Sequence, residues 1–214
     1  MEPTRLRLRS SSNAESKWRA FLGPYLPSRA LAEGAHLLSF HDIELRLSRP
    51  RKTRIGDYRE PDSAGFHRIS MNLGIDRGRF LWTLVHELAH LRVFERHGRH
   101  AQAHGKLWKE EFRHLMIPFV REDVYPLEFL PNMLRHLENP KATVQSDAAL
   151  FRSFREMSGS TAAQLLDEIS LGESFRLKDG RSFIKLQERR TRVLCESLPD
   201  GRRYLIHKSA EVST

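Results

Sequence analysis

Residues 80–96 read FLWTLVHELAHLRVFER and carry the pattern H-E-x-x-H at His86, Glu87 and His90. In an α-helix, residues four apart lie on one face with Cβ atoms about 5–6 Å apart, so His86 and His90 can bind one metal ion together. Glu87 then lies beside the ion and not on it. A carboxylate in that place can take a proton from a zinc-bound water, which is the division of labour in metalloproteases.

The same stretch has the apolar periodicity of an amphipathic helix. At about 100° per residue, its apolar side chains gather on the side of the helix opposite the two histidines. These side chains are Leu81, Leu84, Val85, Leu88 and Leu91. The helix is therefore expected to pack through one face and to present His86 and His90 on the other. A surface helix that spelled the motif by coincidence would need no such division of faces.

A catalytic zinc site takes three protein ligands and leaves the fourth position to water. The candidates for the third ligand downstream of the motif are His97, His100, His104, Glu110 and Glu111. The extended metzincin pattern is absent, because Val93 and Arg96 occupy the positions of its glycine and its third histidine. A glutamate on the following helix, Glu110 or Glu111, would be the gluzincin arrangement.

The spacing favours His104 among these candidates. The first helix should end near His97, because the glycine that follows it is the usual residue just past a helix C-terminus. Residues 106–116 have apolar side chains at helical spacing and predict a second helix. A histidine at the start of that helix can return over the first one. Glu110 remains a rival ligand, whereas His97 and His100 are expected as helix-end or loop histidines.

Residues 86–112, HELAHLRVFERHGRHAQAHGKLWKEEF, resemble the active-site region of SprT-like metallopeptidases, the family that includes the DNA–protein crosslink protease Spartan. In that family H-E-x-x-H is followed by a loop and then by H-G-x-x-(aromatic)-K, which residues 104–109 match. The resemblance implies that His104 is the third zinc ligand. Residues 49–59 and 67–72 also look like the strand region before this helix in bacterial members. The likeness covers residues 20–140.

The order of elements around the motif predicts an α+β fold. Residues 16–37 predict two helical pieces, and residues 43–47 and 67–72 predict strands. This order fits a zincin-like catalytic domain over residues 16–140, with a small antiparallel sheet. Its edge strand would bind an extended peptide by β-augmentation. Residues 1–15 are expected to form a disordered basic tail.

Two further regions with different predicted structure follow residue 140. Residues 141–171 predict a helical linker region, with short amphipathic helices at 147–156 and 162–169. Residues 172–214 predict a small β-module of two hairpins, since Asp-Gly, a favoured two-residue turn, occurs twice. SprT-like proteins often have a cysteine-rich zinc ribbon at this position, but only Cys195 is present. The module is expected to be metal-free, with its cations, Lys185 among them, serving to dock a substrate or nucleic acid or simply to cover the core.

Composition predicts the compartment. One cysteine, Cys195, excludes an internal disulfide framework and a Cys-based zinc ribbon. No apolar stretch reaches the roughly 18 residues of a transmembrane helix, so no membrane partner is expected. The first residues carry positive charge but no apolar segment typical of a secretory signal. A cytoplasmic location is therefore expected.

The formal net charge of +9 raises the question of a nucleic-acid partner. The densest basic segment contains Arg49, Arg51, Lys52, Arg54 and Arg59. Neutralising phosphates with such residues gives sequence-independent affinity for DNA. The alternative is an edge strand whose cations discourage pairing with another sheet. The resemblance to Spartan favours DNA.

Taken together, the sequence predicts a zinc-dependent metallopeptidase that acts on a protein or peptide substrate. His86, His90 and His104 would bind Zn²⁺, and Glu87 would be general base and later proton donor. DNA-associated or DNA-crosslinked proteins are the substrates that the resemblance implies. Two alternatives stay open: a nucleic-acid-binding protein with a structural or vestigial zinc site, and a site-specific regulatory protease independent of DNA.

Overall fold

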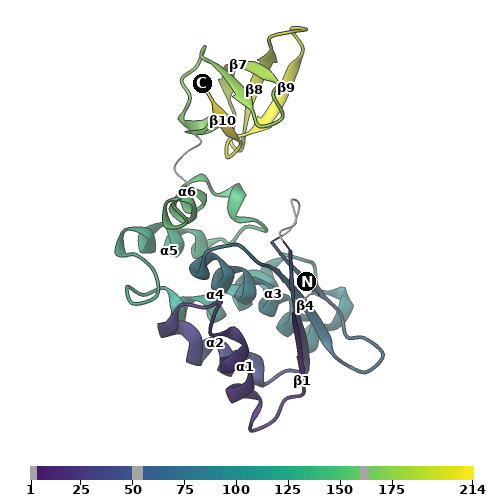
Figure 1. Cartoon of the computed structure of the whole chain (residues 1–214). Helices are drawn as coiled ribbons and strands as arrows, with labels where there is room; N and C mark the ends of the chain where they lie inside the picture. Colours follow the sequence, from purple (N-terminus) through teal and green to yellow (C-terminus); the bar gives the residue numbers. More distant parts are fainter. Residues whose placement is uncertain (1–3, 50–54, 160–163) are drawn as a thin grey trace. The chain divides into compact units, whose positions relative to one another are not determined.

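The computed structural model describes residues 4–49, 55–159 and 164–214, and it divides into two compact units, Met1–Pro140 and Lys141–Thr214. The described residues form six α-helices and two β-sheets (Figure 1). The predicted α+β class is therefore confirmed. The two units are described separately below.

The first unit contains a four-stranded sheet in the order β1-β2-β4-β3. Its strands are β1 (Arg5–Leu8), β2 (Ile43–Ser48), β3 (Gly56–Arg59) and β4 (His67–Asn72). Strand β1 pairs antiparallel with β2, β2 pairs parallel with β4, and β3 pairs antiparallel with β4. The prediction of an antiparallel sheet is thus wrong for one pair. The β3–β4 hairpin places β4 between β2 and β3, which makes β4 parallel to β2.

Strand β1 corrects the prediction of a disordered tail. Its sequence Arg-Leu-Arg-Leu alternates polar and apolar residues, which is the period of a half-buried strand. Leu6 lies opposite Leu45 of β2, and Leu8 lies opposite Ile43. Both partners are fully buried. Residues 5–8 are ordered because these two leucines extend the apolar face of the sheet.

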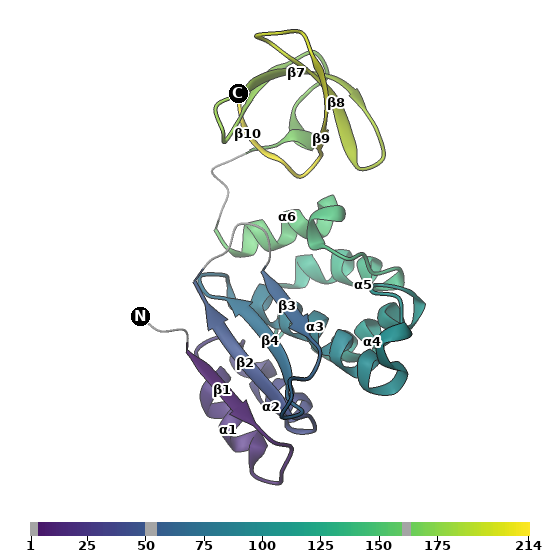
Figure 2. The ribbon, with the colours of Figure 1, turned by 90° about the vertical axis from the view of Figure 1, so that its right-hand side faces the viewer.

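The described residues of the first unit form five α-helices. They are α1 (Ala14–Leu22), α2 (Leu31–Ser39), α3 (Arg77–His97), α4 (Lys106–Met116) and α5 (Leu130–Glu138), with short 3-10 turns at Ser28–Ala30, Gly98–His100, Ile117–Phe119 and Leu127–Phe129. Helix α3 packs against strands β3 and β4, α4 packs against α3, and α5 packs against α4. In the view of Figure 2, α1 and α2 lie behind the sheet. The two helical pieces predicted at 16–37, the strand at 67–72 and the helix at 106–116 are confirmed.

Helix α3 is the element that carries the motif, and its ends have clear local causes. Asp76 caps the N-terminus, because its carboxylate accepts a hydrogen bond from the backbone of Arg79 at 2.7 Å. Gly98, with φ of 65°, ends the helix where the sequence predicted. The five apolar residues of the predicted packing face, Leu81, Leu84, Val85, Leu88 and Leu91, are all buried. The histidines lie on another side of the helix, where His86 contacts Trp108 and Phe112 of α4.

The second unit contains helix α6 and a six-stranded sheet in the order β5-β10-β6-β7-β8-β9. Its elements are a 3-10 turn at Val144–Ser146, α6 (Ala148–Met157), β5 (Gln164–Leu165), a 3-10 turn at Leu166–Glu168, β6 (Ser174–Leu177), β7 (Ser182–Glu188), β8 (Arg192–Ser197), β9 (Arg203–His207) and β10 (Glu211–Ser213). The two Asp-Gly hairpins are confirmed as β6–β7 and β8–β9.

Two expectations for this unit need correction. The helix predicted at 162–169 is absent from its described part, where β5 pairs with β10 and a 3-10 turn follows. Leu165, Leu166 and Ile169 are buried, so their apolar pattern reflects the second core. Lys185, counted above among the docking cations, is also buried, with 1% of its surface exposed. Within the described ranges, no helix has the length and apolar character needed to cross a membrane.

Candidate metal centre

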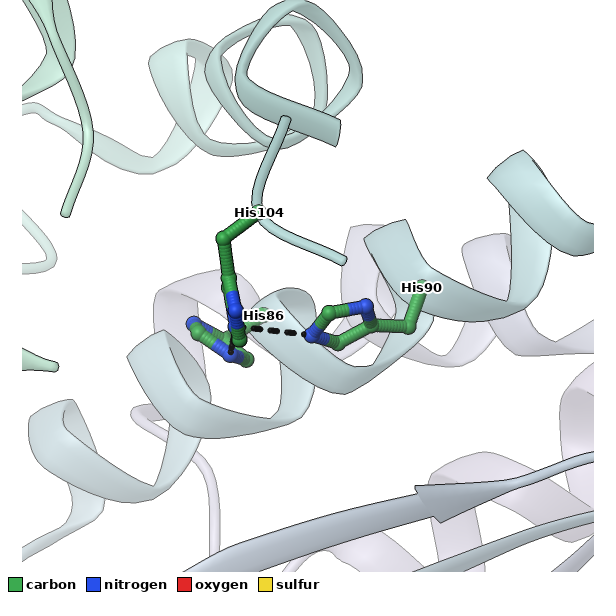
Figure 3. Close-up of side chains that lie close together, drawn as sticks. All are labelled: His86, His90 and His104. Atoms are coloured by element: carbon green, nitrogen blue, oxygen red, sulfur yellow. Dashed lines mark hydrogen bonds between the residues drawn. The ribbon is translucent and has the colours of Figure 1, made fainter. Parts of the chain in front are cut away.

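Three histidine rings converge where α3 meets the loop before α4. His86 and His90 project from adjacent turns of α3, and His104 reaches back over them from the loop (Figure 3). The Nε2 atom of His104 lies 3.0 Å from Nε2 of His90 and 3.1 Å from Nε2 of His86. Among the described residues, these three form the one group of His, Cys, Asp and Glu side chains placed to bind a metal ion.

The spacing of the three nitrogens suits a small tetrahedral ion. Zinc–nitrogen distances of about 2.0–2.1 Å place neighbouring nitrogens of a tetrahedron about 3.3–3.4 Å apart. The two measured separations are only slightly shorter, and all three donor atoms lie within 4.8 Å of one another. A shift of a few tenths of an ångström would accommodate the ion. Three imidazoles leave a fourth position for water or substrate.

The backbone conformation of His104 is strained. Its φ of 57° makes it the one residue other than glycine with positive φ among the described residues. It occupies the third position of a turn in which Gly105 N–H donates to Gln102 C=O at 3.0 Å. Glycine or asparagine normally takes that position in such a turn. A strained conformation at a residue whose ring meets two other histidines indicates a functional constraint.

Trp108 forms an apolar wall against all three imidazoles. Its ring centroid lies 4.6 Å from that of His86, 5.3 Å from that of His90 and 4.6 Å from that of His104. The ring is fully buried, and its indole N–H points at the backbone carbonyl of His86 at 3.4 Å. The first turn of α4 therefore restricts the three rings and excludes water from one side of the site.

Burial keeps the three histidines uncharged. It is the main cause that lowers the pKa of His86 well below its usual value, and proximity to His90 adds to it. Burial and the neighbouring His104 lower the pKa of His90 to about 4. Burial also lowers the pKa of His104. Neutral imidazoles offer the lone pair that a metal ion requires.

Glu87 is buried against the edge strand β3. It has 7% of its surface exposed, and a methyl group at Gly56 would lie only 2.6 Å from its Oε1 atom. The same methyl group would lie 2.7 Å from Cγ2 of Thr83, one turn earlier on α3. Only glycine allows β3 to approach the helix this closely. The backbone of β3 at Gly56 therefore lies close against the Glu87 side chain. The sequence analysis missed this approach, although a glycine in a strand can mark one.

Tyr58, two residues along β3 from Gly56, supports the metal-binding face at His90. Its ring is nearly parallel to that of His90, with 8° between the planes and 6.3 Å between the centroids. The Tyr58 hydroxyl and His67 Nδ1 lie 2.9 Å apart, and His67 Nε2 lies 3.4 Å from a carboxylate oxygen of Glu95. Glu95 also pairs with His41 at 2.9 Å. Burial raises the pKa of Glu95, but hydrogen bonds from His41 and His67 outweigh it and lower that pKa to about 2.

The rival ligands face other partners. Glu110 is 56% exposed and lies 3.9 Å from Lys106. Glu111 is buried, but its carboxylate pairs with Arg92 at 3.0 Å and with Arg96 at 2.5 Å, joining α4 to α3. His97 and His100 lie outside the histidine group. The structure brings His104, and none of the other candidates, to His86 and His90.

Other polar residues of the first unit lie apart from the histidine group. Tyr125 donates a hydrogen bond to Gly78 C=O at 2.9 Å near the start of α3, and His114 is exposed on α4. Arg51, Lys52 and Arg54 of the basic segment lie outside the described residues. Arg49 is exposed just after β2, and Arg59 is exposed on β3. Neither Tyr125 nor His114 belongs to the histidine group.

The chain was compared with protein-family models, with curated proteins and with solved structures, and no match was found in any of the three comparisons.

Proposed function

We propose that this protein is a zinc-dependent metallopeptidase of SprT-like type, with a zincin-like catalytic unit formed by residues 16–140. The observation that carries the proposal is the convergence of three imidazole Nε2 atoms, with His104 3.0 Å from His90 and 3.1 Å from His86. Glu87, the residue after His86, is buried on the same helix. The match of residues 86–112 to the SprT-like motif supports the same reading. His86, His90 and His104 would hold the ion.

The ligand set fits zinc and a hydrolytic role. Three neutral histidines with an open fourth position are the ligand set of a catalytic zinc site. A zinc ion bound there would lower the pKa of a coordinated water toward about 7 and polarise the scissile carbonyl. Glu87, on the side of α3 that Gly56 approaches closely, would accept the proton of the attacking water and deliver it to the leaving amine. Strand β3 is the free edge beside Glu87, where an extended peptide could add to the sheet.

A closed structural zinc site is less well supported. It would need a fourth protein ligand, and the described residues supply three. Glu110 pairs with Lys106 at the surface, and Cys195 is buried in the core of the second unit. Burial raises the pKa of the Cys195 thiol to about 11, which disfavours the thiolate that zinc requires. We include a cytoplasmic location in the proposal, since a lone cysteine suits a reducing compartment.

The test is metal content together with proteolysis. Wild-type protein should contain one zinc per chain and cleave an unfolded substrate such as casein until a chelator is added. Glu87→Gln should retain the zinc and the fold but lose activity by about 10²–10⁴-fold, because an amide cannot transfer the proton. His86→Ala should lose the zinc. Wild-type protein free of zinc, or an active Glu87→Gln variant, would contradict the proposal.

The position of Glu87 gives a second, finer test. Gly56→Ala should push the Glu87 carboxylate aside, because the added methyl group has no space. A displacement of about 1 Å can cost roughly 10²-fold in rate, while zinc content should not change. Gly23→Ala is the matched control, since its added Cβ would meet its nearest neighbour at an ordinary 3.4 Å. Equal activity in the two variants would remove Gly56 from the site.

The proposal also names a class of substrate. We propose proteins associated with or crosslinked to DNA, supported by the net charge of +9 and by the resemblance to Spartan. A site-specific regulatory protease would instead cleave one protein without DNA. Cleavage of a DNA-binding protein with single-stranded DNA, with double-stranded DNA and with no DNA separates the two. Stimulation by DNA supports the first, and equal rates in all three assays support the second.

A further inference from the structure

One face of the sheet in the first unit is lined with arginines. Residues that alternate with the buried positions of the four strands form two rows across it. One row is Arg5, Arg46, Ser70 and Asp57, and the other is Arg7, Glu44, Arg68 and Arg59. We name the arginines of these rows, Arg5, Arg7, Arg46, Arg59 and Arg68, the arginine face. It is opposite to the face that meets α3.

The charges of this surface are layered. The guanidinium side chains lie outermost, with 39% of Arg7, 45% of Arg46 and 66% of Arg59 exposed. Their carboxylate partners lie beneath, with 3% of Glu44 and 12% of Asp57 exposed. An approaching molecule therefore meets positive charge first. A merely solvated face would not require a carboxylate as deeply buried as Glu44, since burying a charge is costly unless it is paired.

Ion pairs and a ring contact hold Arg7 of the arginine face, and the neighbouring Arg9, in fixed positions. Arg7 pairs with Glu44 at 3.6 Å and with Asp62 at 3.1 Å, and its guanidinium lies 3.9 Å from the centre of the Phe66 ring. Arg9, at the end of β1, covers the same ring at 4.2 Å and pairs with Asp42. Side chains already fixed in this way lose less conformational freedom when they bind a ligand. Among the described residues, the buried Nε atom of Arg68 makes no hydrogen bond.

We propose that the arginine face binds the phosphate backbone of double-stranded DNA. Fixed, planar guanidiniums recognise phosphate through paired hydrogen bonds, and a row of them suits a repeating polyanion. Single-stranded nucleic acid is usually bound by stacking its bases on aromatic rings. The two rows contain no aromatic residue, and the ring of Phe66 is already covered by Arg7 and Arg9. A duplex, which presents phosphates and hides its bases, fits this surface better.

This inference deepens the proposed function and rests on it for the role of DNA in substrate choice. The surface itself uses none of the histidines and lies on the opposite face of the sheet from α3. Binding can therefore be measured without the reaction. Zinc content and casein cleavage, measured on the same preparations, report separately on the peptidase.

The experiment is fluorescence anisotropy of a labelled 20-base-pair duplex with the full-length, zinc-loaded protein over a range of salt concentrations. The test variant is Arg5→Gln/Arg46→Gln, which removes two charges from neighbouring strands far from β3. The matched control is Lys17→Gln/Arg19→Gln, which removes two charges from exposed positions on α1. Arg5→Gln alone is a second test variant in case the double substitution unfolds.

We expect wild-type affinity to fall steeply with salt, by about 0.9 log units per log unit of salt for each phosphate contact. The test variant should lower that slope by about 2 and weaken binding roughly 10-fold or more, with zinc and casein cleavage unchanged. The control should bind within about 2-fold of wild type. Absence of duplex binding at low salt, equal weakening by the control, or tighter binding of single-stranded DNA would each overturn the proposal.

Discussion

A buried lysine in the second unit and the histidine group in the first unit meet their neighbours in opposite ways. In the second unit, the ammonium group of Lys185 is enclosed at 1% exposure, yet it donates to the carbonyl of Ile169 at 2.6 Å and to the carboxylate of Glu188 at 2.7 Å. In the first unit, His86, His90 and His104 point their nitrogens at one another. Each of these rings can only give a lone pair or a proton to the other two. The group contains no carboxylate.

The difference separates a structural polar group from a binding site. Lys185 is satisfied within its own fold and needs no ligand, because its donors meet a carbonyl and a carboxylate. The nitrogens of the histidine group meet only one another, and the three together could hold a metal ion. Bringing such groups together away from water is costly when their hydrogen bonding is incomplete, so the cluster is consistent with the proposed metal site. The predictions below test each side of this contrast.

The largest effect is expected from removing the third ligand. His104→Ala should lose zinc at moderate chelator concentration and with it all measurable peptide cleavage, because two histidines cannot hold the ion stably. Glu110→Gln should keep both, since Glu110 faces solvent and pairs with Lys106. Metal analysis by mass spectrometry after dialysis against chelator measures the difference. Zinc loss in Glu110→Gln with retention in His104→Ala would exchange the two assignments.

A smaller effect, confined to stability, is expected in the second unit. Lys185→Met removes the donor that the Ile169 carbonyl and Glu188 share, and it should lower the free energy of unfolding by roughly 1–3 kcal/mol. Lys178→Met, on a side chain that is 74% exposed, should cost under about 1 kcal/mol. Urea denaturation compares them, and zinc content should not change in either. Loss of zinc in Lys185→Met would mean that the two polar clusters are coupled.

The histidine group could be predicted from the sequence because the residues that place it are close together in the chain. The spacing of His86 and His90 is fixed by one helix, and the glycine and helix signals after them brought His104 within reach. What the sequence could not give depends on contacts between distant segments. Gly56 meets Glu87 only because β3 packs against α3, and no periodicity within residues 56–59 reveals that packing.

The errors in the fold have the same origin. Residues 5–8 became a strand because Leu6 and Leu8 lie opposite buried residues of β2, a pairing across more than thirty positions of the chain. Strand β4 lies parallel to β2 because the chain returns from β3 into the position between β3 and β2. Strand propensity does not specify that position. The apolar residues at 164–169 were assigned to a helix although they belong to the core of the second sheet. Short apolar runs are ambiguous between helix and strand until their packing partner is known.

The smallest predicted effect concerns the strain at His104 and returns to the contrast between the units. In zinc-free protein, His104→Gly should be more stable than His104→Ala by roughly 0.5–1.5 kcal/mol. Both variants lack the imidazole, but only glycine adopts a φ of 57° without steric cost. Thermal unfolding of the two apo-variants measures this difference without any contribution from metal. If the alanine variant is equally stable, the backbone at this position is unstrained, and only the convergence of the rings would remain as an argument that the turn is maintained for metal binding.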